Sequence, residues 1–351
     1  MVVLTERETC RPLPWLEAAL QQALNGAHHS HALLVHGPSG TGSFGFALAL
    51  AAAWLCEQPS ADQTACGHCT SCRLLAARTH PDLHLIVPEA LRAEAGLPVE
   101  AQDGEDVRKR KPSREIRVEQ IRAALDFCTL TASRGSTKVV LIHPAEQINA
   151  IGANALLKTL EEPPAGVRFV FSCGASPESL LPTLRSRCQL QRLPLPDRAL
   201  ALAWLLDQGV KEGDVVLDAS GGEPLRALAM VRSGLDGAAW RALPDRLARG
   251  DATALADWPL PVLIDALQKY CHDHMLHAIG CAPRYFSATA LSQGGPPVRS
   301  ALMALTRWAI ELRELAQDAE HPWHAALSCE ALVSHAQGVL REAGGSIHSR
   351  P

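Results

Sequence analysis

Residues 31–56, HALLVHGPSGTGSFGFALALAAAWLC, are the stretch that decides the fold. They open with HALLVHG, a short apolar run of the kind that forms a buried strand. They close with FGFALALAAAWLC, whose apolar part is about half the length of a membrane span, so we expect a buried helix. A glycine-rich turn lies between the two. Strand, glycine turn and helix in this order form the unit that opens a P-loop fold.

The turn keeps the glycines of a nucleotide-binding P-loop but lacks the residues that touch the nucleotide. In that motif, G-x-x-x-x-G-K followed by Ser or Thr, the lysine neutralises phosphate and the hydroxyl holds Mg²⁺. Gly37 and Gly42 occupy the glycine positions, with Gly40 between them. Ser43 stands at the lysine position and Phe44 at the Ser/Thr position. We predict a degenerate P-loop without tight ATP binding. Weak binding through backbone N–H groups remains the alternative.

Two further residues of an ATPase site are missing after the apolar strand pattern KVVLI, within residues 138–147. An ATPase needs a magnesium-supporting Asp and a catalytic Glu at the end of this strand, but His143 and Pro144 stand there. Glu146 comes three residues after His143, where we expect an exposed helix start. Charge-assisted phosphate contacts are the strong ones, so these losses predict no useful ATP hydrolysis. The glycine turn then serves to connect strand and helix at close quarters.

The composition is that of a globular chain rich in helix. Its 351 residues are 47% hydrophobic, 20% charged and 4% aromatic, enough for two or three domains. The formal net charge of −4 argues against a protein that coats nucleic acid by charge alone. The first residues lack a basic segment followed by an apolar core. We therefore expect a cytoplasmic protein without membrane contact.

Four cysteines cluster in residues 56–72, CEQPSADQTACGHCTSC. Cys56, Cys66, Cys69 and Cys72 provide two overlapping C-x-x-C pairs and one distant partner. Four thiolates suit tetrahedral zinc, and a site without an open position is structural. We predict a zinc ion that folds this small insertion, with His68 facing solvent. Chance packing of small buried residues and a redox pair are weaker alternatives.

Strands alternate with helices up to about residue 196, and only helical periodicity follows. Further strands are predicted in DLHLIVPE, KVVLIHP, VRFVFSCG and QLQRLPLP. Helices are predicted in IRVEQIRAALDFCTL, NAIGANALLKTLEEPP and SPESLLPTLRSRC. In the later part they are predicted in DRALALAWLLDQG, GEPLRALAMVRSG, PLPVLIDALQKYCHDHMLHAIG, PVRSALMALTRWAIELRELAQD and HPWHAALSCEALVSHAQGVLREAG. This alternation predicts a parallel sheet covered on both faces. We predict an α/β domain over 1–196, a small helical unit over 197–240 and a larger helical unit over 241–345.

Two polar segments have competing interpretations. Residues 90–114, which end in RKRKPSR, are predicted to form a mobile surface loop, with DNA contact as the alternative. CHDHMLHAIGC places His274 and His277 one helical turn apart, between Cys271 and Cys281. A packed helix with partly exposed histidines is favoured there over a metal-binding face.

Several stretches together resemble the delta-prime branch of the bacterial clamp-loader subunits, which belong to the AAA+ family. They are HALLVHGPSGTG, the cysteine cluster, HPDLHLI, IRVEQIR, NALLKTLEEPP and LRSRC. NALLKTLEEPP followed by SRC about 22 residues later is specific to clamp-loader ATPase-like proteins. The degenerate turn separates this chain from the ATP-hydrolysing tau/gamma branch. The resemblance covers residues 10–196 strongly and the helical parts weakly.

The resemblance implies an AAA+ module, a helical lid and a collar that assembles a five-membered, hetero-oligomeric ring within the DNA polymerase III holoenzyme. Its neighbours there would be tau/gamma and delta subunits, and the ring loads the sliding clamp on primed DNA. Arg187 of the SRC motif would reach a neighbour's ATP site as an arginine finger, stabilising charge on the γ-phosphate. Ser186 and Cys188 would shape its turn, with Arg185 solvated.

The resemblance extends to two nucleotide-sensing positions. GGEPLRALAM is similar to the lid segment with the second sensor arginine, here Arg226, for which we expect a structural role. Gly174 and Ala175 align with the usual first-sensor threonines. Two other functions remain open: a P-loop ATPase with an altered site, and a zinc-dependent DNA-binding module.

Overall fold

The computed structural model describes residues 10–26, 30–38, 40–98, 112–174, 176–291, 301–317 and 324–343. The chain clusters into two compact units. One contains Met1–Ala201 with Glu223–Ala229, and the other contains Leu202–Gly222 with Met230–Pro351. The division into three domains stays a prediction. Within the described ranges, no helix combines the length and the apolar character needed to cross a membrane.

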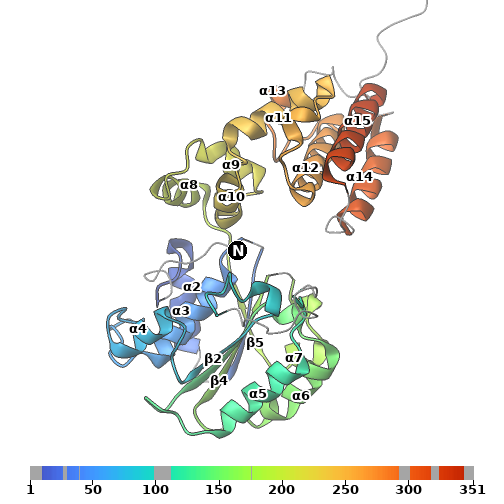
Figure 1. Ribbon diagram of the computed structural model, residues 1–351. Helices are drawn as coiled ribbons and strands as arrows, with labels where there is room; N and C mark the ends of the chain where they lie inside the picture. Colours follow the sequence, from blue (N-terminus) through green and yellow to red (C-terminus); the bar gives the residue numbers. More distant parts are fainter. Residues whose placement is uncertain are drawn as a thin grey trace, which may run out of the picture. The chain divides into compact units, whose positions relative to one another are not determined.

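A five-stranded parallel sheet forms the centre of the first unit (Figure 1). The strand order is β2-β3-β4-β1-β5, with every neighbouring pair parallel. The strands are β1 (Ala32–His36), β2 (Leu83–Ile86), β3 (Lys138–Ile142), β4 (Val167–Cys173) and β5 (Gln189–Arg192). All five lie where the apolar runs predict them. Because the strands are parallel, the ends of β1, β3 and β4 meet at one edge of the sheet.

Helices cover both faces of this sheet, as predicted (Figure 1). The α-helices are α2 (Glu17–Gly26), α3 (Ser43–Leu55), α4 (Thr70–Ala76), α5 (Val118–Thr129), α6 (Ala150–Glu161) and α7 (Pro182–Arg185). Short 3-10 turns are η1 (Pro14–Leu16), η3 (Glu89–Leu91), η4 (Ala145–Gln147) and η5 (Pro177–Ser179). On one side α5 and α6 pack together and bury leucine and isoleucine against β1, β3 and β4. On the other side α3, almost entirely buried, contacts β3 and β4.

Two local predictions need correction. SPESLLPTLRSRC is not one helix, because η5 and the four-residue α7 divide it. Pro182 begins α7, and a residue before proline is excluded from the helical region; Leu181 accordingly has an extended backbone. In the predicted polar loop, η3 forms at its beginning. Residues 99–111, with most of RKRKPSR, lie outside the described residues.

The described part of the second unit is helical, as predicted. Its helices lie in the segments from α8 onward: α8 (Arg198–Asp207), α9 (Gly213–Ala219), α10 (Pro224–Arg232), α11 (Gly237–Arg249), η6 (Thr253–Leu255), α12 (Leu260–Ala278), α13 (Ala288–Leu291), α14 (Ala301–Gln317) and α15 (Ala325–Ala343). Arg198–Ala201 of α8 and Pro224–Ala229 of α10 are counted with the first unit. Sequence periodicity missed α9, α11 and α13.

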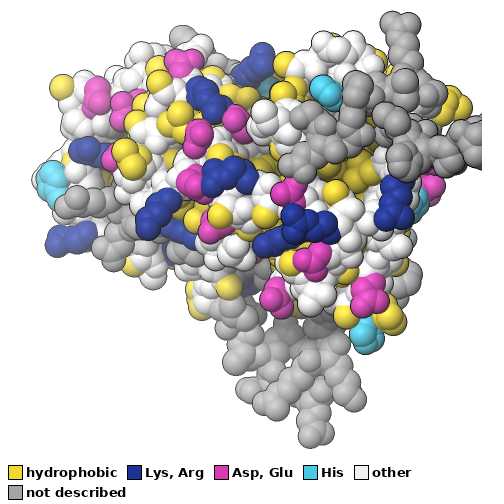
Figure 2. All heavy atoms as spheres, turned by 90° about the horizontal axis from the view of Figure 1, so that it is seen from above, with side chains coloured by type: hydrophobic (Ala, Val, Ile, Leu, Met, Phe, Trp, Pro, Cys, Tyr) yellow, Lys and Arg dark blue, Asp and Glu magenta, His cyan; other side chains and the backbone are white. Residues whose placement is uncertain are grey.

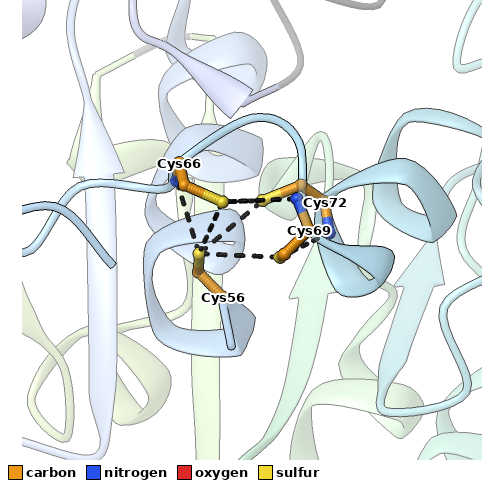
Figure 3. Close-up of side chains that lie close together, drawn as sticks. All are labelled: Cys56, Cys66, Cys69 and Cys72. Atoms are coloured by element: carbon orange, nitrogen blue, oxygen red, sulfur yellow. Dashed lines mark hydrogen bonds between the residues drawn. The ribbon is translucent and has the colours of Figure 1, made fainter. Parts of the chain in front are cut away.

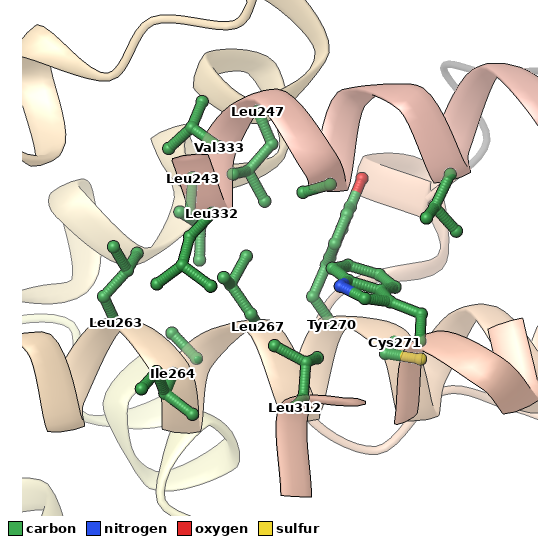
Figure 4. Close-up of a cluster of buried hydrophobic side chains, with 14 of the residues drawn as sticks. Leu243, Leu247, Leu263, Ile264, Leu267, Tyr270, Cys271, Leu312, Leu332 and Val333 are labelled. Atoms are coloured by element: carbon green, nitrogen blue, oxygen red, sulfur yellow. The ribbon is translucent and has the colours of Figure 1, made fainter. Parts of the chain in front are cut away.

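The core of the second unit lies where α11, α12, α14 and α15 converge (Figure 4). Leu263, Leu267, Tyr270 and Cys271 recur at helical spacing along α12 and point into it. This spacing puts one stripe of a helix on one side, so α12 supplies a continuous apolar face to its neighbours. On the face shown in Figure 2, Lys and Arg side chains are interspersed with Asp and Glu, as the small net charge suggests.

Candidate functional sites

The glycine turn joins β1 to α3 at the edge where the strands end. Gly40 and Gly42 have φ angles of +78° and +100°, in the left-handed region that side chains rarely adopt. A Cβ atom on Gly42 would lie only 2.6 Å from Cδ1 of Leu13. A Cβ atom on Gly37 would lie 3.0 Å from the carbonyl oxygen of Leu193. The turn therefore needs its glycines for its own backbone and packing.

Hydrogen bonds hold the turn from inside and from η1. The Thr41 hydroxyl donates to the carbonyl oxygen of Pro38 at 2.8 Å. The indole N–H of Trp15 donates to the carbonyl oxygen of Thr41 at 2.9 Å. Thr41 is fully buried, so these bonds satisfy groups that water cannot reach. They are the contacts expected of a rigid connection between strand and helix.

The segment that begins α10 lies against the same turn. A Cβ atom on Gly40 would lie 3.0 Å from Cβ of Glu223 and 3.2 Å from Cβ of Arg226. Within the segment, Nη1 of Arg226 lies 3.7 Å from Oε2 of Glu223. Arg226, the predicted sensor counterpart, thus pairs with a neighbour on its own segment and contributes to covering the turn. Its structural role remains a prediction.

Phe44 and His143 lie in contact beside the turn. Their ring centroids are 4.6 Å apart and the planes make an angle of 27°. Phe44 is in the first turn of α3, and His143 directly follows β3. In a working P-loop these positions carry the hydroxyl and the carboxylate that hold Mg²⁺. The stacked rings provide no oxygen, the ligand that Mg²⁺ prefers, so two losses identified separately in the sequence form one packed contact.

His143 is a neutral packing residue. Its Nδ1 lies 3.1 Å from the hydroxyl oxygen of Ser172, a buried residue of β4. Burial lowers the pKa of His143 to about 4, so the ring is uncharged at neutral pH. His143 therefore supplies no cation that could replace the missing lysine of the P-loop.

Glu146 is half-buried, and the prediction of an exposed helix start is wrong. It lies in η4, and its Oε1 accepts the backbone N–H of Gly174 at 3.1 Å. The short 3-10 turn keeps the carboxylate at the edge of the sheet, where β3 and β4 end side by side. Gly174, a predicted first-sensor position, is thus held by this carboxylate, whereas Ala175 lies outside the described residues.

Arg187 lies between α7 and β5, and its guanidinium donates to Glu161, to the Thr183 carbonyl and, at 3.4 Å, to the Ser186 hydroxyl. Its Nε donates to Oε1 of Glu161 at 2.9 Å, and its Nη2 donates to the same oxygen. Its Nη1 donates to the carbonyl oxygen of Thr183 at 2.8 Å. The side chains of Arg187 and Glu161 are 30% and 53% exposed. Glu161 ends α6, so this ion pair joins the motifs NALLKTLEEPP and SRC, which the sequence analysis identified without predicting their contact.

The residues around Arg187 form the turn that carries it. The Ser186 hydroxyl donates to the carbonyl oxygen of Thr183 at 3.1 Å. Cys188 packs against the core of the first unit, and burial raises the pKa of its thiol to about 12. Arg185 lies 3.8 Å from Glu178 in an ion pair, where a solvated side chain was expected. Cys188 is thus a neutral anchor for the turn, while the catalytic role of Arg187 remains a prediction.

The four cysteines gather as predicted (Figure 3). The Sγ atom of Cys56 lies 3.6 Å from that of Cys66, 3.8 Å from that of Cys69 and 3.7 Å from that of Cys72. Gly67, with φ of +79°, allows the tight turn between the first C-x-x-C pair. Among the described residues this is the one cluster of its kind, and its four sulfurs could hold a metal ion.

Backbone N–H groups point at the sulfurs of the cluster. The N–H of Cys66 donates to the sulfur of Cys56, and the N–H of Cys69 donates to the sulfur of Cys66, both at 3.3 Å. Burial acts to raise the pKa of Cys66, but N–H groups of His68 and Cys69 outweigh it and lower that pKa to about 6. A thiol with this pKa is deprotonated at neutral pH and suited to metal binding, whereas burial raises the pKa values of Cys56 and Cys72. His68 itself is exposed, as predicted.

A polar network joins the cysteine module to the sheet. Ser71 donates to Glu57 at 3.2 Å, and Nε2 of His80 lies 3.0 Å from the Ser71 hydroxyl. Nδ1 of His80 accepts the N–H of Asp82 at 3.0 Å, so Nε2 carries the proton. The carboxylate of Asp82 accepts the backbone N–H of Arg134 at 2.8 Å, and Nη2 of Arg134 donates to Oε1 of Glu57 at 2.7 Å. Sequence reasoning missed this closed circuit, because its members come from distant segments.

The histidines and cysteines of α12 do not form a metal site in the described structure. His274 is buried and meets Tyr270 edge-on, with ring centroids 4.5 Å apart. Its position four residues after Tyr270 places it on the core face, so the expectation of partial exposure is wrong for this residue. Cys271 is buried and donates to a backbone carbonyl of α14, whereas Cys281 is exposed. The packed-helix interpretation holds.

Comparisons with known proteins agree on one group of relatives. A family model described as "DNA polymerase III, delta subunit" matches residues 14–197. A protein of Pseudomonas aeruginosa named DNA polymerase III subunit delta' is 41% identical over 218 residues, 61% of this chain and 60% of the relative. This chain thus spans about 60% of that relative's length. A Yersinia pestis protein of the same name is 35% identical over 282 residues, 73% of this chain and 76% of the relative.

A solved structure of a DNA polymerase III gamma subunit-related protein from Thermotoga maritima also aligns with the chain. The alignment covers 93% of this chain and 99% of the other, with 16% identity and a TM-score of 0.45. The part matched by the family model contains the sheet, the glycine turn, the cysteine cluster and Arg187.

Proposed function

This chain belongs to the delta-prime subunit family of DNA polymerase III, and we propose that it is a stator of the clamp loader that hydrolyses no ATP itself. In this role it joins tau/gamma and delta subunits in a hetero-oligomeric ring in the cytoplasm. The ring opens the sliding clamp and places it on primed DNA, using ATP that the neighbouring subunits hydrolyse. The helices over 241–345 would form the collar of the ring, and those over 197–240 its lid.

The contact between Phe44 and His143 carries the proposal that this subunit is not an ATPase. It occupies the position of the Mg²⁺ ligands with two stacked, uncharged rings. Since Mg²⁺ and the P-loop lysine neutralise the phosphates in active members, a nucleotide at this turn would lack both of these partners. Arg226, which lies against the turn, is paired with the carboxylate of Glu223.

Calorimetry tests this proposal directly. The purified chain is titrated with ATP and Mg²⁺, and phosphate release is followed in parallel, with the tau/gamma subunit as the positive control. We expect no micromolar binding and no turnover. Micromolar binding with turnover would instead establish the alternative function, a P-loop ATPase with an altered site.

We further propose that Arg187 acts in trans as an arginine finger. Its guanidinium is partly exposed on the surface of the first unit, where a partner could approach it. Arginine is suited to this role because it keeps its charge and presents several donors in a planar fork. A guanidinium brought to a γ-phosphate by a partner stabilises the charge that develops during transfer.

We propose that the cysteine cluster binds a structural zinc ion. A tetrahedron with Zn–S bonds of about 2.3 Å has edges of about 3.8 Å. Four of the six sulfur–sulfur distances lie between 3.6 and 3.9 Å and match those edges, and all six are within 4.8 Å. Four thiolates leave no open position, so zinc would supply no catalysis but would hold α3 and α4 together. The net charge of −4 and the mixed charges of Figure 2 disfavour a DNA-binding module.

A further inference from the structure

We infer that Glu161 is a positioning residue for Arg187, which fixes the guanidinium in one orientation for the neighbour's γ-phosphate. This inference rests on the proposed function of Arg187 as a finger in trans. The inference rests on hydrogen bonds from two sides of the guanidinium. Nε and Nη2 donate to the carboxylate of Glu161, and Nη1 donates to the carbonyl oxygen of Thr183. An arginine has five N–H donors in a rigid plane, so holding two of its edges sets the direction of the third.

Both ends of this ion pair stand on anchored backbone. Leu160, directly before Glu161, and Leu184, in α7, are each 1% exposed and belong to the same hydrophobic cluster. The N–H of Arg187 donates to the carbonyl oxygen of Leu184 at 3.1 Å. The distance between α6 and the turn that carries Arg187 is therefore set by packed core residues. A carboxylate at the end of α6 can hold the guanidinium at a defined place.

These hydrogen bonds leave one N–H donor of Arg187 for the phosphate. Nη2 carries two N–H groups, and among the described residues its acceptor is Oε1 of Glu161. The second N–H of Nη2 lies on the side of the fork away from that oxygen. Because Glu161 orients the Arg187 side chain before the phosphate arrives, the entropy cost of ordering this long side chain does not fall on the catalytic step. Glu161 thus contributes to the rate of the step without touching the nucleotide.

A role in stability alone does not account for the pair. The side chain of Glu161 is 53% exposed, and exposed ion pairs contribute little to folding. Loss of Glu161 should therefore leave the fold intact and change the orientation of Arg187. This separation makes the inference testable in the assembled complex.

The experiment measures ATP hydrolysis by the reconstituted clamp loader with its sliding clamp and primed DNA. It compares the wild-type subunit with R187A, E161A, E161Q and E162A. Glu162 is the exposed neighbour that caps α6, so E162A removes the same charge one residue away. Subunit assembly is checked by gel filtration, and folding by circular dichroism. kcat and KM for ATP are determined separately.

We expect R187A to lower kcat by the share of the one ATP site that Arg187 serves, E161A to lower it toward the level of R187A, and KM and assembly to stay unchanged. E161Q should keep most of the rate, because its amide oxygen can still accept from Nε. E162A should behave as wild type. The double variant E161A/R187A should be no slower than R187A, since residues that act through one another are not additive.

The possible failures are distinguishable. If R187A has the wild-type rate, the finger proposal fails and this inference with it. If R187A is slow but E161A is as fast as wild type, the finger stands and the positioning role of Glu161 is wrong. A faster E161A would show that Glu161 withholds Arg187, which also overturns positioning. If E161A assembles poorly, kcat is determined for the assembled fraction of that variant and for E161Q. A wild-type kcat of the assembled E161A fraction would overturn the positioning role of Glu161.

Discussion

Phe44 stacks on His143 at 4.6 Å between ring centroids, and the pair fills the place where a P-loop ATPase binds Mg²⁺. Phe44 lies in the first turn of α3, after β1, and His143 directly follows β3. A lost lysine or a lost hydroxyl could be tolerated variation at one position. Two residues at these positions that pack against each other form a piece of the core, which supports the proposal that this turn binds no Mg²⁺.

Phe44→Ala should destabilise the protein by about 3–5 kcal/mol, the usual cost of removing a buried phenyl ring. The ring is 6% exposed, and its loss leaves a cavity beside His143. Urea denaturation measures the change in the free energy of unfolding. Ile151→Ala, at a side chain that is 66% exposed, is the control and should cost little. Equal effects of the two substitutions would contradict the packing role of Phe44.

Acid should destabilise the protein partly through His143. Burial lowers its pKa to about 4, so the folded protein binds fewer protons at this ring than the unfolded chain. The stabilisation is complete above about pH 6.5 and is lost as the pH falls towards 4. At 1.36 kcal/mol per pKa unit, the loss is about 3 kcal/mol.

Denaturation of the wild type and of His143→Gln between these pH values measures that loss. Glutamine keeps a partner for Ser172 but does not titrate, so its unfolding free energy should fall less steeply with acid. Some slope should remain, because burial also lowers the pKa of His274 to about 4. Identical slopes in the two proteins would remove His143 from the explanation.

Arg187→Ala should lower the DNA-stimulated ATPase rate of the reconstituted loader. The loss should equal the fraction of the rate that comes from the one neighbouring ATP site to which Arg187 contributes. The ion pair is half-exposed, so the free energy of unfolding should change by no more than about 1 kcal/mol. Arg185→Ala is the matched control, since it removes a guanidinium two residues away that pairs with Glu178 instead. An equal loss of rate in both variants would indicate a general charge effect.

Purified protein should contain about one zinc ion per chain, because four thiolates complete one tetrahedral site. Cys69→Ser should lower the zinc content, measured by atomic absorption. Cys10→Ser is the control: Cys10 is buried beside the module, with its sulfur 3.7 Å from the carbonyl oxygen of Cys72, but lies outside the four. Full zinc content in Cys69→Ser would contradict the assignment of that ligand.

Removal of zinc should also weaken hydrogen bonds at residues outside the cysteine cluster. Glu57 directly follows Cys56, and Ser71 directly precedes Cys72, so the network through His80 and Asp82 depends on the folded module. After zinc removal, the backbone N–H of Arg134 should exchange faster with deuterium, since its acceptor Asp82 is held by that network. Exchange in α6 should stay unchanged. Unaltered exchange at Arg134 would show that the network stands without the metal.

The central strands β1, β3 and β4 were predictable because they are buried on both faces, so their sequences are short apolar runs. The letters of KVVLI and HALLV alone indicate this burial. SPESLLPTLRSRC was mispredicted because its apolar spacing is helical while Pro182 prevents one continuous helix. In α11 the internal Pro244 and a polar composition hid a helix that tertiary packing stabilises.

By itself, the sequence determined the order of the strands and of most helices, the glycine turn without lysine, and the four cysteines that we propose as zinc ligands. Each of these depends on residues close together in the chain. Only the tertiary structure decided that Phe44 meets His143, that Glu161 holds Arg187 across 26 residues, and that Glu57 meets Arg134 across 77. The physical reason is that periodicity records whether a side chain is buried, whereas its partner depends on which remote segments the parallel sheet brings to the same edge.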